Sequence, residues 1–162
     1  MYKEEIMKCE IIFDAKPDAV PYNYRISYKV SLLCLIIFLC CGRKGCSLVK
    51  LHMVSSALSN SREQKKLYNF CDSSSNTYML IHFDPVVTRA LLYATSDRLI
   101  TQQVNGLFKL TDKGKTLVNK IINDKNIFNS EIWYLNSLST KLTEEKISIL
   151  MKNWGQLYVE DK

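Results

Sequence analysis

The longest apolar stretch of the chain runs from Val30 to Cys41, with Ser31 as its one polar residue. Since its apolar side chains fall on every side of a helix, the stretch predicts a helix over residues 26–41 that is buried nearly all round. Crossing a bilayer takes about 20 consecutive apolar residues, so a stretch of this length between Lys29 and Arg43 predicts a core helix without membrane contact. Gly42 is the expected C-cap of that helix.

Three further helices are predicted from apolar positions spaced three or four apart. Ser47 is the expected N-cap of a helix over residues 48–58, and another helix is expected over residues 62–71. Residues 79–83 are predicted to form a short strand. Asp84 and Pro85 then start the next helix, because Asp accepts hydrogen bonds from free N–H groups and Pro suits the first helical position.

A β-hairpin is predicted after this helix. Residues 99–103 and 107–110 can pair across Val104-Asn105-Gly106, and Asn-Gly is the strongest short hairpin signal. Thr111 is the expected cap of a helix over residues 112–122. A last helical region is expected over residues 130–158, interrupted near residues 139–140.

The order of these elements predicts a mainly α fold with a small β-hairpin. Residues 1–25, which contain Pro17 and Pro21, are expected to form an N-terminal arm. Residues 26–122 form the main domain, and residues 123–162 form a C-terminal helical extension.

Charge is concentrated in the middle of the chain. The 162 residues carry a net charge of +6. Residues 26–71 contain seven basic and one acidic residue, and residues 85–125 contain seven basic and three acidic residues, whereas both ends are slightly acidic. A basic middle suits a nucleic acid or an acidic protein partner, and charge alone leaves both open.

The sequence contains no pattern typical of a catalytic or metal site. The six cysteines include no C-x-x-C pair, and His52 and His82 are isolated, so we expect reduced thiols that pack as small apolar groups. Nucleophile-elbow, phosphate-loop and zinc-protease motifs are absent from the sequence. Asp18 with Glu144, Glu145 and Lys146 makes a poor nuclease pattern because the two parts are far apart. A protein without catalytic, cofactor or metal residues is predicted.

Residues 99–117 carry a more specific pattern. Leu99-Ile100, the hairpin turn, Leu110-Thr111-Asp112-Lys113-Gly114 and Leu117 resemble the signature of many bacterial winged-helix proteins. The resemblance implies a winged helix-turn-helix domain over residues 26–122, with Asn105 at the tip of the wing. One difference is that Ser96-Asp97-Arg98 stands where a glycine usually precedes the Leu-Ile pair, and Asp tolerates the left-handed conformation better than most residues.

In such a domain the helix after Asp84 would be the recognition helix. It offers one Arg and no Asn, Gln or Lys, so contact with the DNA backbone is favoured over sequence readout. The candidate nucleic-acid contacts are basic and polar residues of this helix, the wing and its flanks, the helix after the wing and the first basic turn: Arg43, Lys44, Thr88, Arg89, Arg98, Asn105, Lys109, Lys113 and Lys115.

Four aromatic residues near the C-terminus are candidate interface residues: Trp133, Tyr134, Trp154 and Tyr158. Aromatic side chains often anchor protein interfaces. They also dock a last helix on its own domain, and the sequence leaves both roles open.

The layout from about Val20 to Asn153 has a narrower resemblance. It resembles the small middle components of bacterial ABC three-component systems of the Lamassu anti-phage type. The resemblance implies a cytoplasmic, non-catalytic adaptor that links or restrains a nuclease-type effector on a coiled-coil ATPase related to chromosome-maintenance proteins. A free-standing winged-helix transcription regulator is the alternative, and it would form a symmetric dimer on two half-sites.

Overall fold

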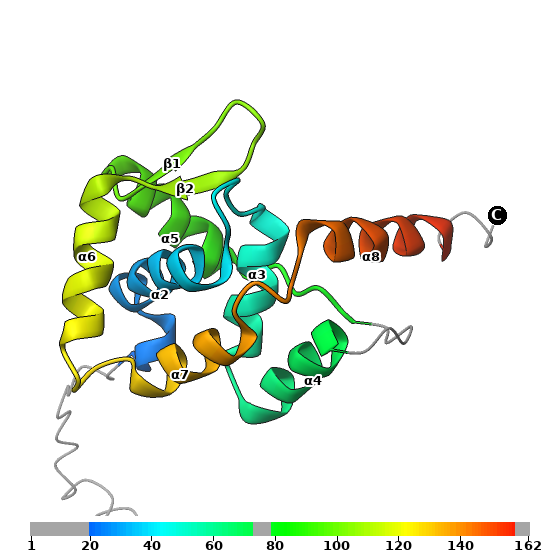
Figure 1. Cartoon of the computed structure of the whole chain (residues 1–162), viewed down its shortest axis with the longest axis horizontal. Coiled ribbons are helices and arrows are strands. Elements are labelled where there is room, and N and C mark those ends of the chain that lie inside the picture. Colours follow the sequence, from blue (N-terminus) through cyan, green and yellow to red (C-terminus); the bar gives the residue numbers. More distant parts are fainter. Residues whose placement is uncertain (1–19, 73–78, 158–162) are drawn as a thin grey trace, which may run out of the picture.

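The computed structural model describes residues 20–72 and 79–157, which form a mainly helical body with one small sheet (Figure 1). The predicted combination of helices and one hairpin is confirmed. In chain order the elements are η2 (Tyr22–Tyr24), α2 (Ile26–Cys40), α3 (Leu48–Ala57), α4 (Ser61–Asp72), α5 (Pro85–Ser96), β1 (Ile100–Gln102), β2 (Phe108–Leu110), α6 (Asp112–Asn123), α7 (Asn129–Leu138) and α8 (Glu144–Leu157).

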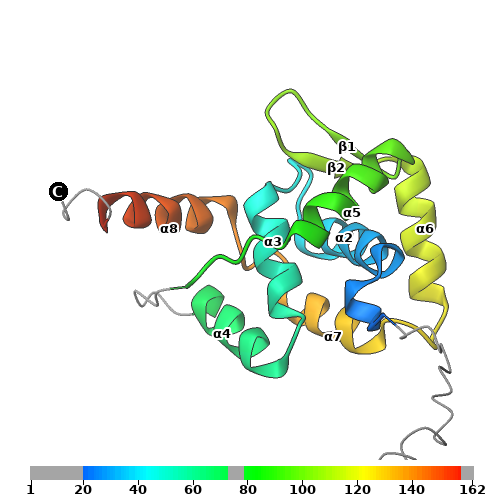
Figure 2. The same cartoon turned by 180° about the vertical axis from the view of Figure 1, so that it is seen from behind.

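Helix α2 is the centre of the core. Helices α3, α5, α6 and α7 pack around it, as the front and back views show (Figures 1 and 2). Its Leu33, Cys34, Leu35 and Ile36 are fully buried, whereas Phe38 is partly exposed. The predicted burial of this helix is therefore confirmed for its central and C-terminal part, with Ser27 and Phe38 as its exposed positions. In the described residues, no helix combines the length and apolar character that a membrane crossing needs.

Three predicted N-caps are formed by the expected side chains. The hydroxyl of Ser47 accepts from the N–H of Lys50, and the carboxylate of Asp84 accepts from the N–H of Val86. The hydroxyl of Thr111 accepts from the N–H of Gly114. Each bond satisfies one N–H group that the first turn of a helix leaves free.

Two local predictions are wrong. Residues 79–83 form no strand, and the chain reaches Asp84 without ladder pairing. Gly42 is not a left-handed C-cap, because α2 ends at Cys40 and Cys41 already has an extended conformation with φ −114° and ψ 135°. The glycine of this turn that needs a positive φ is Gly45, at +104°.

The hairpin has the predicted position. Its register pairs Ile100 with Leu110 and Gln102 with Phe108. Gly106 has φ +81°, and its N–H donates to the carbonyl of Gln103, so the predicted loop Val104-Asn105-Gly106 closes with glycine in the left-handed position.

Gly114 explains why a glycine follows Lys113 in this pattern. A Cβ atom at this position would lie 2.1 Å from the carbonyl oxygen of Leu99. The first turn of α6 can therefore pack on the start of the hairpin only where the residue has no side chain.

The C-terminal helices behave differently from one another. Helix α7 packs on α2, and its Leu135 and Leu138 are fully buried. Helix α8 contacts α3 near its start and then extends away from the body (Figure 1). Between them Ser139 has φ 44° and ψ −134°, which ends α7 close to the predicted interruption.

Candidate interface around α5, the basic turn and the hairpin

Helix α5 shows two different faces. Val87, Ala90, Leu91 and Ala94 are buried against the core. The opposite face exposes Thr88, Arg89, Leu92 and Tyr93, and the Leu92 side chain keeps 67% of its surface in contact with solvent. The solvent-facing side of the predicted recognition helix is therefore partly apolar.

An open groove lies at the N-terminal half of α5. Its volume is about 430 Å³. Its lining residues are Phe83, Asp84, Pro85, Thr88, Arg89 and Leu92. Phe83 is 57% exposed although its ring contacts that of His52 in a tilted arrangement, with 5.0 Å between the ring centroids and 58° between the ring planes. The groove thus combines apolar walls with two charged residues of opposite sign, Asp84 and Arg89.

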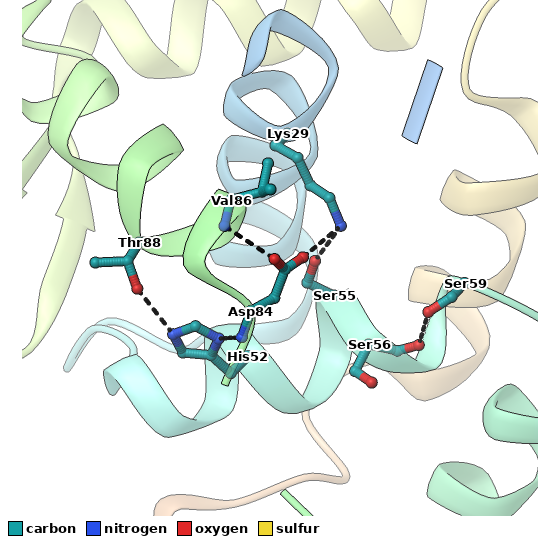
Figure 3. A network of polar contacts seen from close by, with 8 residues as sticks. All are labelled: Lys29, His52, Ser55, Ser56, Ser59, Asp84, Val86 and Thr88. Carbon is teal, nitrogen blue, oxygen red and sulfur yellow. Dashed lines mark hydrogen bonds and ion pairs between the residues drawn. The ribbon is translucent and has the colours of Figure 1, made fainter. Parts of the chain in front are cut away.

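A polar network beneath this groove fixes the start of α5 (Figure 3). Lys29 from α2 and Ser55 from α3 are both buried, and the Nζ atom of Lys29 donates to the Oγ atom of Ser55 at 3.1 Å. The same Nζ atom lies 3.6 Å from the Oδ2 atom of Asp84. Burial lowers the pKa of Lys29, whereas the Asp84 carboxylate acts in the opposite direction. One ammonium group therefore joins α2, α3 and the cap of α5.

His52 supplies a second connection to the same cap. Its Nδ1 atom accepts from the backbone N–H of Asp84 at 3.1 Å, and its Nε2 atom lies 3.5 Å from the hydroxyl of Thr88 (Figure 3). Burial lowers the pKa of His52, which favours the neutral ring that this acceptor role requires. His52 therefore links α3 to the start of α5, and Thr88 is turned partly toward it.

The first basic turn, residues 42–45, lies against the hairpin. The side-chain amide of Gln103 donates to the carbonyl of Lys44 at 2.9 Å. Directly after the turn, Cys46 and Phe108 exchange both backbone hydrogen bonds, at 2.8 and 2.9 Å, as an isolated antiparallel bridge. This contact brings the exposed side chains of Arg43 and Lys44 to the hairpin that carries Asn105.

A second group of basic residues surrounds the C-terminal end of α5. Arg98 is exposed with φ 56°, and the ammonium group of Lys113 donates to the carbonyl of Asp97 at 2.8 Å. Lys115 pairs with Asp112 at 3.2 Å. Lys109 lies opposite Thr101 in the hairpin. Apart from Arg89, which lines the groove, the predicted basic candidates thus fall into two groups, one at the basic turn and one around the C-terminal end of α5 and the hairpin.

The expected left-handed residue is different from the observed one. Asp97 has φ −76°, and Arg98 takes the left-handed conformation. The N–H of Leu99 donates to the carbonyl of Ala94, and the N–H of Arg98 donates to that of Thr95. These two bonds are those of a Schellman C-cap, in which the left-handed position is normally glycine.

The four aromatic candidates do not form one surface. Trp133 is 73% exposed. Tyr134 is buried, and its hydroxyl donates to the carbonyl of Gln64, so it packs within its own chain and is not free for a partner. Trp154 is half-buried beside the core. Tyr158 lies outside the described residues.

The residues of the nuclease-like pattern have ordinary structural partners. The carboxylate of Glu144 accepts from the N–H of Ser47, and Lys146 donates to the carbonyl of Cys71 at the end of α4. Asp18 lies outside the described residues. Across residues 20–72 and 79–157, no three His, Cys, Asp or Glu side chains lie close enough to hold a metal ion.

Sequence reasoning missed the groove and the network below it. Lys29 stands directly before the longest apolar stretch, and a buried lysine needs an oxygen partner. That signal was present in the sequence, but the partners of Lys29 come from α3 and from the residue before α5.

Comparison of the chain with protein-family models, with curated proteins and with solved structures finds no match.

Proposed function

We propose that this chain is a winged-helix protein-interaction subunit that acts as a non-catalytic adaptor in a larger complex. The observation that carries the proposal is the exposed apolar face of α5. Phe83, Leu92 and Tyr93 are each more than half exposed on or beside the helix that would read DNA. Apolar side chains of this size make poor base contacts, whereas they are typical of the buried centre of a protein interface.

The order of elements supports the winged-helix part of the proposal. Helix α2, the paired residue Cys46, α3, α5 and the β1–β2 hairpin follow one another in the order of a winged helix-turn-helix domain. Helix α4 would be an insertion between the second and third helices. It packs on α3 and α7, so it leaves the exposed face of α5 open.

The chemistry of the surface indicates the kind of partner. The groove at α5 is mainly apolar, with Arg89 and the Lys29-paired Asp84 in its lining, and Arg98 and Lys113 lie at the other end of the helix. An apolar protein segment with acidic residues at its margins would match both features. Backbone contact with DNA through Arg43 and Lys44 is compatible with such a complex, because phosphate contacts need no base-reading side chain.

The resemblance to Lamassu-type middle components supplies the specific partners. On that basis the adaptor belongs to a cytoplasmic bacterial anti-phage complex and links or restrains a nuclease-type effector on a coiled-coil ATPase. The support for this step is the sequence resemblance over about residues 20–153. The apolar face of α5 supports only the more general role in protein interaction.

The test is a tagged pull-down from the native host with identification of the bound proteins by mass. We expect a large coiled-coil ATPase and a nuclease-like chain with the wild type, and their loss with Leu92→Glu. The matched control is Ile149→Glu, which places the same charge at an exposed apolar position of α8 that is 53% exposed. Recovery of the chain alone, or only as a homodimer, would overturn the adaptor proposal. Equal recovery of partners by both variants would exclude the face of α5 as the contact.

The alternative is a free-standing winged-helix regulator. The observation that favours it is the set of exposed basic residues beside the hairpin, at the basic turn and at the C-terminal end of α5. It requires binding to a defined DNA site that is lost in an Arg89→Ala, Lys113→Ala double variant. Unchanged binding of that variant would exclude it.

A further inference from the structure

The groove at the start of α5 has exposed apolar walls and one cation without an acidic partner. Phe83 and Leu92 are 57% and 67% exposed. The carboxylate of Asp84 caps α5 and lies 3.6 Å from the ammonium group of Lys29. Among the residues that the structure describes, no acidic side chain forms an ion pair with Arg89. The groove therefore matches an apolar segment with an acidic margin.

The chain contains such a segment ahead of its first described residue. Outside the described ranges, Ile11-Ile12-Phe13 is the longest run of apolar residues, and Glu10 and Asp14 stand on either side of it. The N-terminal arm up to residue 19 holds three basic and five acidic residues, whereas the whole chain carries a net charge of +6. The segment thus complements the groove in apolar character and in charge.

The arm joins the body close to the groove. Lys29 lies in the first turn of α2, and its ammonium group lies beside Asp84 in the groove lining (Figure 3). Arg25 directly precedes α2, and its Nε atom donates to the carbonyl of Val20 at 3.0 Å. Val20 and the groove are thus each within one side chain of the start of α2. The seven Cα steps from Val20 back to Phe13 can span about 23 Å, so Phe13 can reach the groove.

We propose that residues 10–14 dock in the groove of their own chain, with the apolar run against Phe83 and Leu92 and an acidic side chain beside Arg89. The arm then covers the exposed face of α5 that a partner would need. The docking rests on the groove and on the sequence of the arm, whereas competition with a partner rests on the proposed function. The arm acts as an internal competitor that a partner segment displaces.

Attachment to the same chain makes a weak contact sufficient. A segment on a short linker has an effective concentration on the order of 1 mM at its site. An intrinsic dissociation constant of about 1 mM would therefore fill the groove about half the time. Because the arm then occupies half of the sites, its loss should raise the affinity for a partner about twofold.

The experiment is a photo-crosslink in the full-length chain. The probe, p-benzoylphenylalanine in place of Leu92, puts a reactive ketone at the wall of the groove. Trypsin releases this position in residues 90–98 and the arm in residues 9–25, because it does not cleave before Pro17. We expect irradiation to link these two peptides, with the link located at residues 10–14 by fragmentation.

Two controls show whether the link is specific and lies within one chain. The same probe in place of Ile149, which is 53% exposed on α8, should give no link to the arm. A mixture of isotope-labelled and unlabelled chains should give only pairs in which both peptides carry the same label. Pairs of mixed label would assign the arm to a second copy and overturn the proposal. A link of equal yield at both probe positions, or no link at the Leu92 position, would also overturn it.

Variants of the arm test its apolar anchor. Phe13→Ser should lower the yield of the linked pair by about fivefold or more, because truncation of an aromatic anchor removes much of the strength of a contact. Phe13→Leu is the matched control and should keep the link. Equal yields from Phe13→Ser and the wild type would contradict the proposed docking.

The crosslink and the pull-down of partners fail independently. Absence of the crosslink removes the docking of the arm and leaves the adaptor proposal to the pull-down. Absence of partners in the pull-down removes the adaptor and leaves the docking of the arm to the crosslink. If both hold, Phe13→Ser should recover more of the partner than the wild type does.

Discussion

The two ends of α5 are held by different means. At the N-terminal end, side chains from α2 and α3 meet Asp84. Its carboxylate lies beside the ammonium group of Lys29, and its backbone N–H donates to His52. At the C-terminal end, backbone hydrogen bonds close the helix in a Schellman cap, in which Arg98 takes a left-handed conformation. The first arrangement gains stability from satisfied polar groups, whereas the second accepts strain at one residue.

This difference matters for the surface that α5 presents. The N-terminal end borders the groove, and its polar network keeps Phe83 and Thr88 in place beside His52. The C-terminal end leads into the hairpin, and its cap sets the direction in which the chain enters β1. A disturbance at the first end should alter the groove, and one at the second should alter stability without altering the groove.

The largest effect is expected from Asp84→Ala. The substitution removes the N-cap of α5 and leaves the buried ammonium of Lys29 without its carboxylate. We expect the free energy of unfolding to fall by about 2–3 kcal/mol, measured by urea denaturation. Asp84→Asn is the matched control, because Asn still caps a helix but carries no charge. Its loss should be about half as large, and equal losses in the two variants would show that the cap contributes nothing.

A smaller loss of stability is expected at low pH, through His52 at the N-terminal end of α5. Burial lowers the pKa of His52 in the folded chain, so as pH falls the unfolded chain takes up this proton first. The contribution of the neutral ring is complete above the ordinary histidine pKa of about 6.5 and is lost below it. Protonated Nδ1 can no longer accept from the N–H of Asp84. We expect stability to fall by about 1–2 kcal/mol between about pH 7 and about pH 5.

Two histidine variants separate this effect from general acid sensitivity. His52→Gln keeps an acceptor near Asp84 without a titrating ring, so the pH dependence should shrink. His82 is exposed, and His82→Gln should leave the pH dependence as in the wild type. The same dependence in all three proteins would show that other groups cause it.

The smallest effect is expected at the other end of α5, with the opposite sign. Glycine adopts the left-handed conformation without the cost that Arg98 bears, so Arg98→Gly should raise the free energy of unfolding by about 1 kcal/mol. Thermal denaturation measures this change. Arg98→Ala is the control, because it removes the charge but keeps Cβ, and its stability should stay near that of the wild type. A gain of equal size in Arg98→Ala would place the cause in the charge.

Local signals in the sequence predicted much of the fold. Ser47, Asp84 and Thr111 cap helices as expected because a cap depends only on residues two or three positions away. The Asn-Gly pair likewise places the hairpin turn from local backbone preference alone. These features can therefore be predicted without knowing how the helices pack against one another.

The parts that sequence reasoning missed depend on tertiary arrangement. Trp133 and Tyr134 are neighbours, yet one is 73% exposed and the other only 4%. Successive residues of a helix point about 100° apart, so the two roles follow from the way α7 sits on α2. The site at α5 was missed for the same reason, since Lys29, Ser55 and Asp84 meet only after three separate segments have packed.

The bridge between Cys46 and Phe108 also implies an order of folding. The hairpin joins neighbouring residues, whereas this bridge joins segments separated by the three helices α3, α4 and α5 and by strand β1. Closing so long a loop costs more conformational entropy than closing the hairpin does, so the local structure is expected to form first. The basic turn would then be added to a hairpin that already exists. By the same reasoning it should be among the first places to open when the native chain fluctuates, which would bring the amide of Cys46 into early hydrogen exchange.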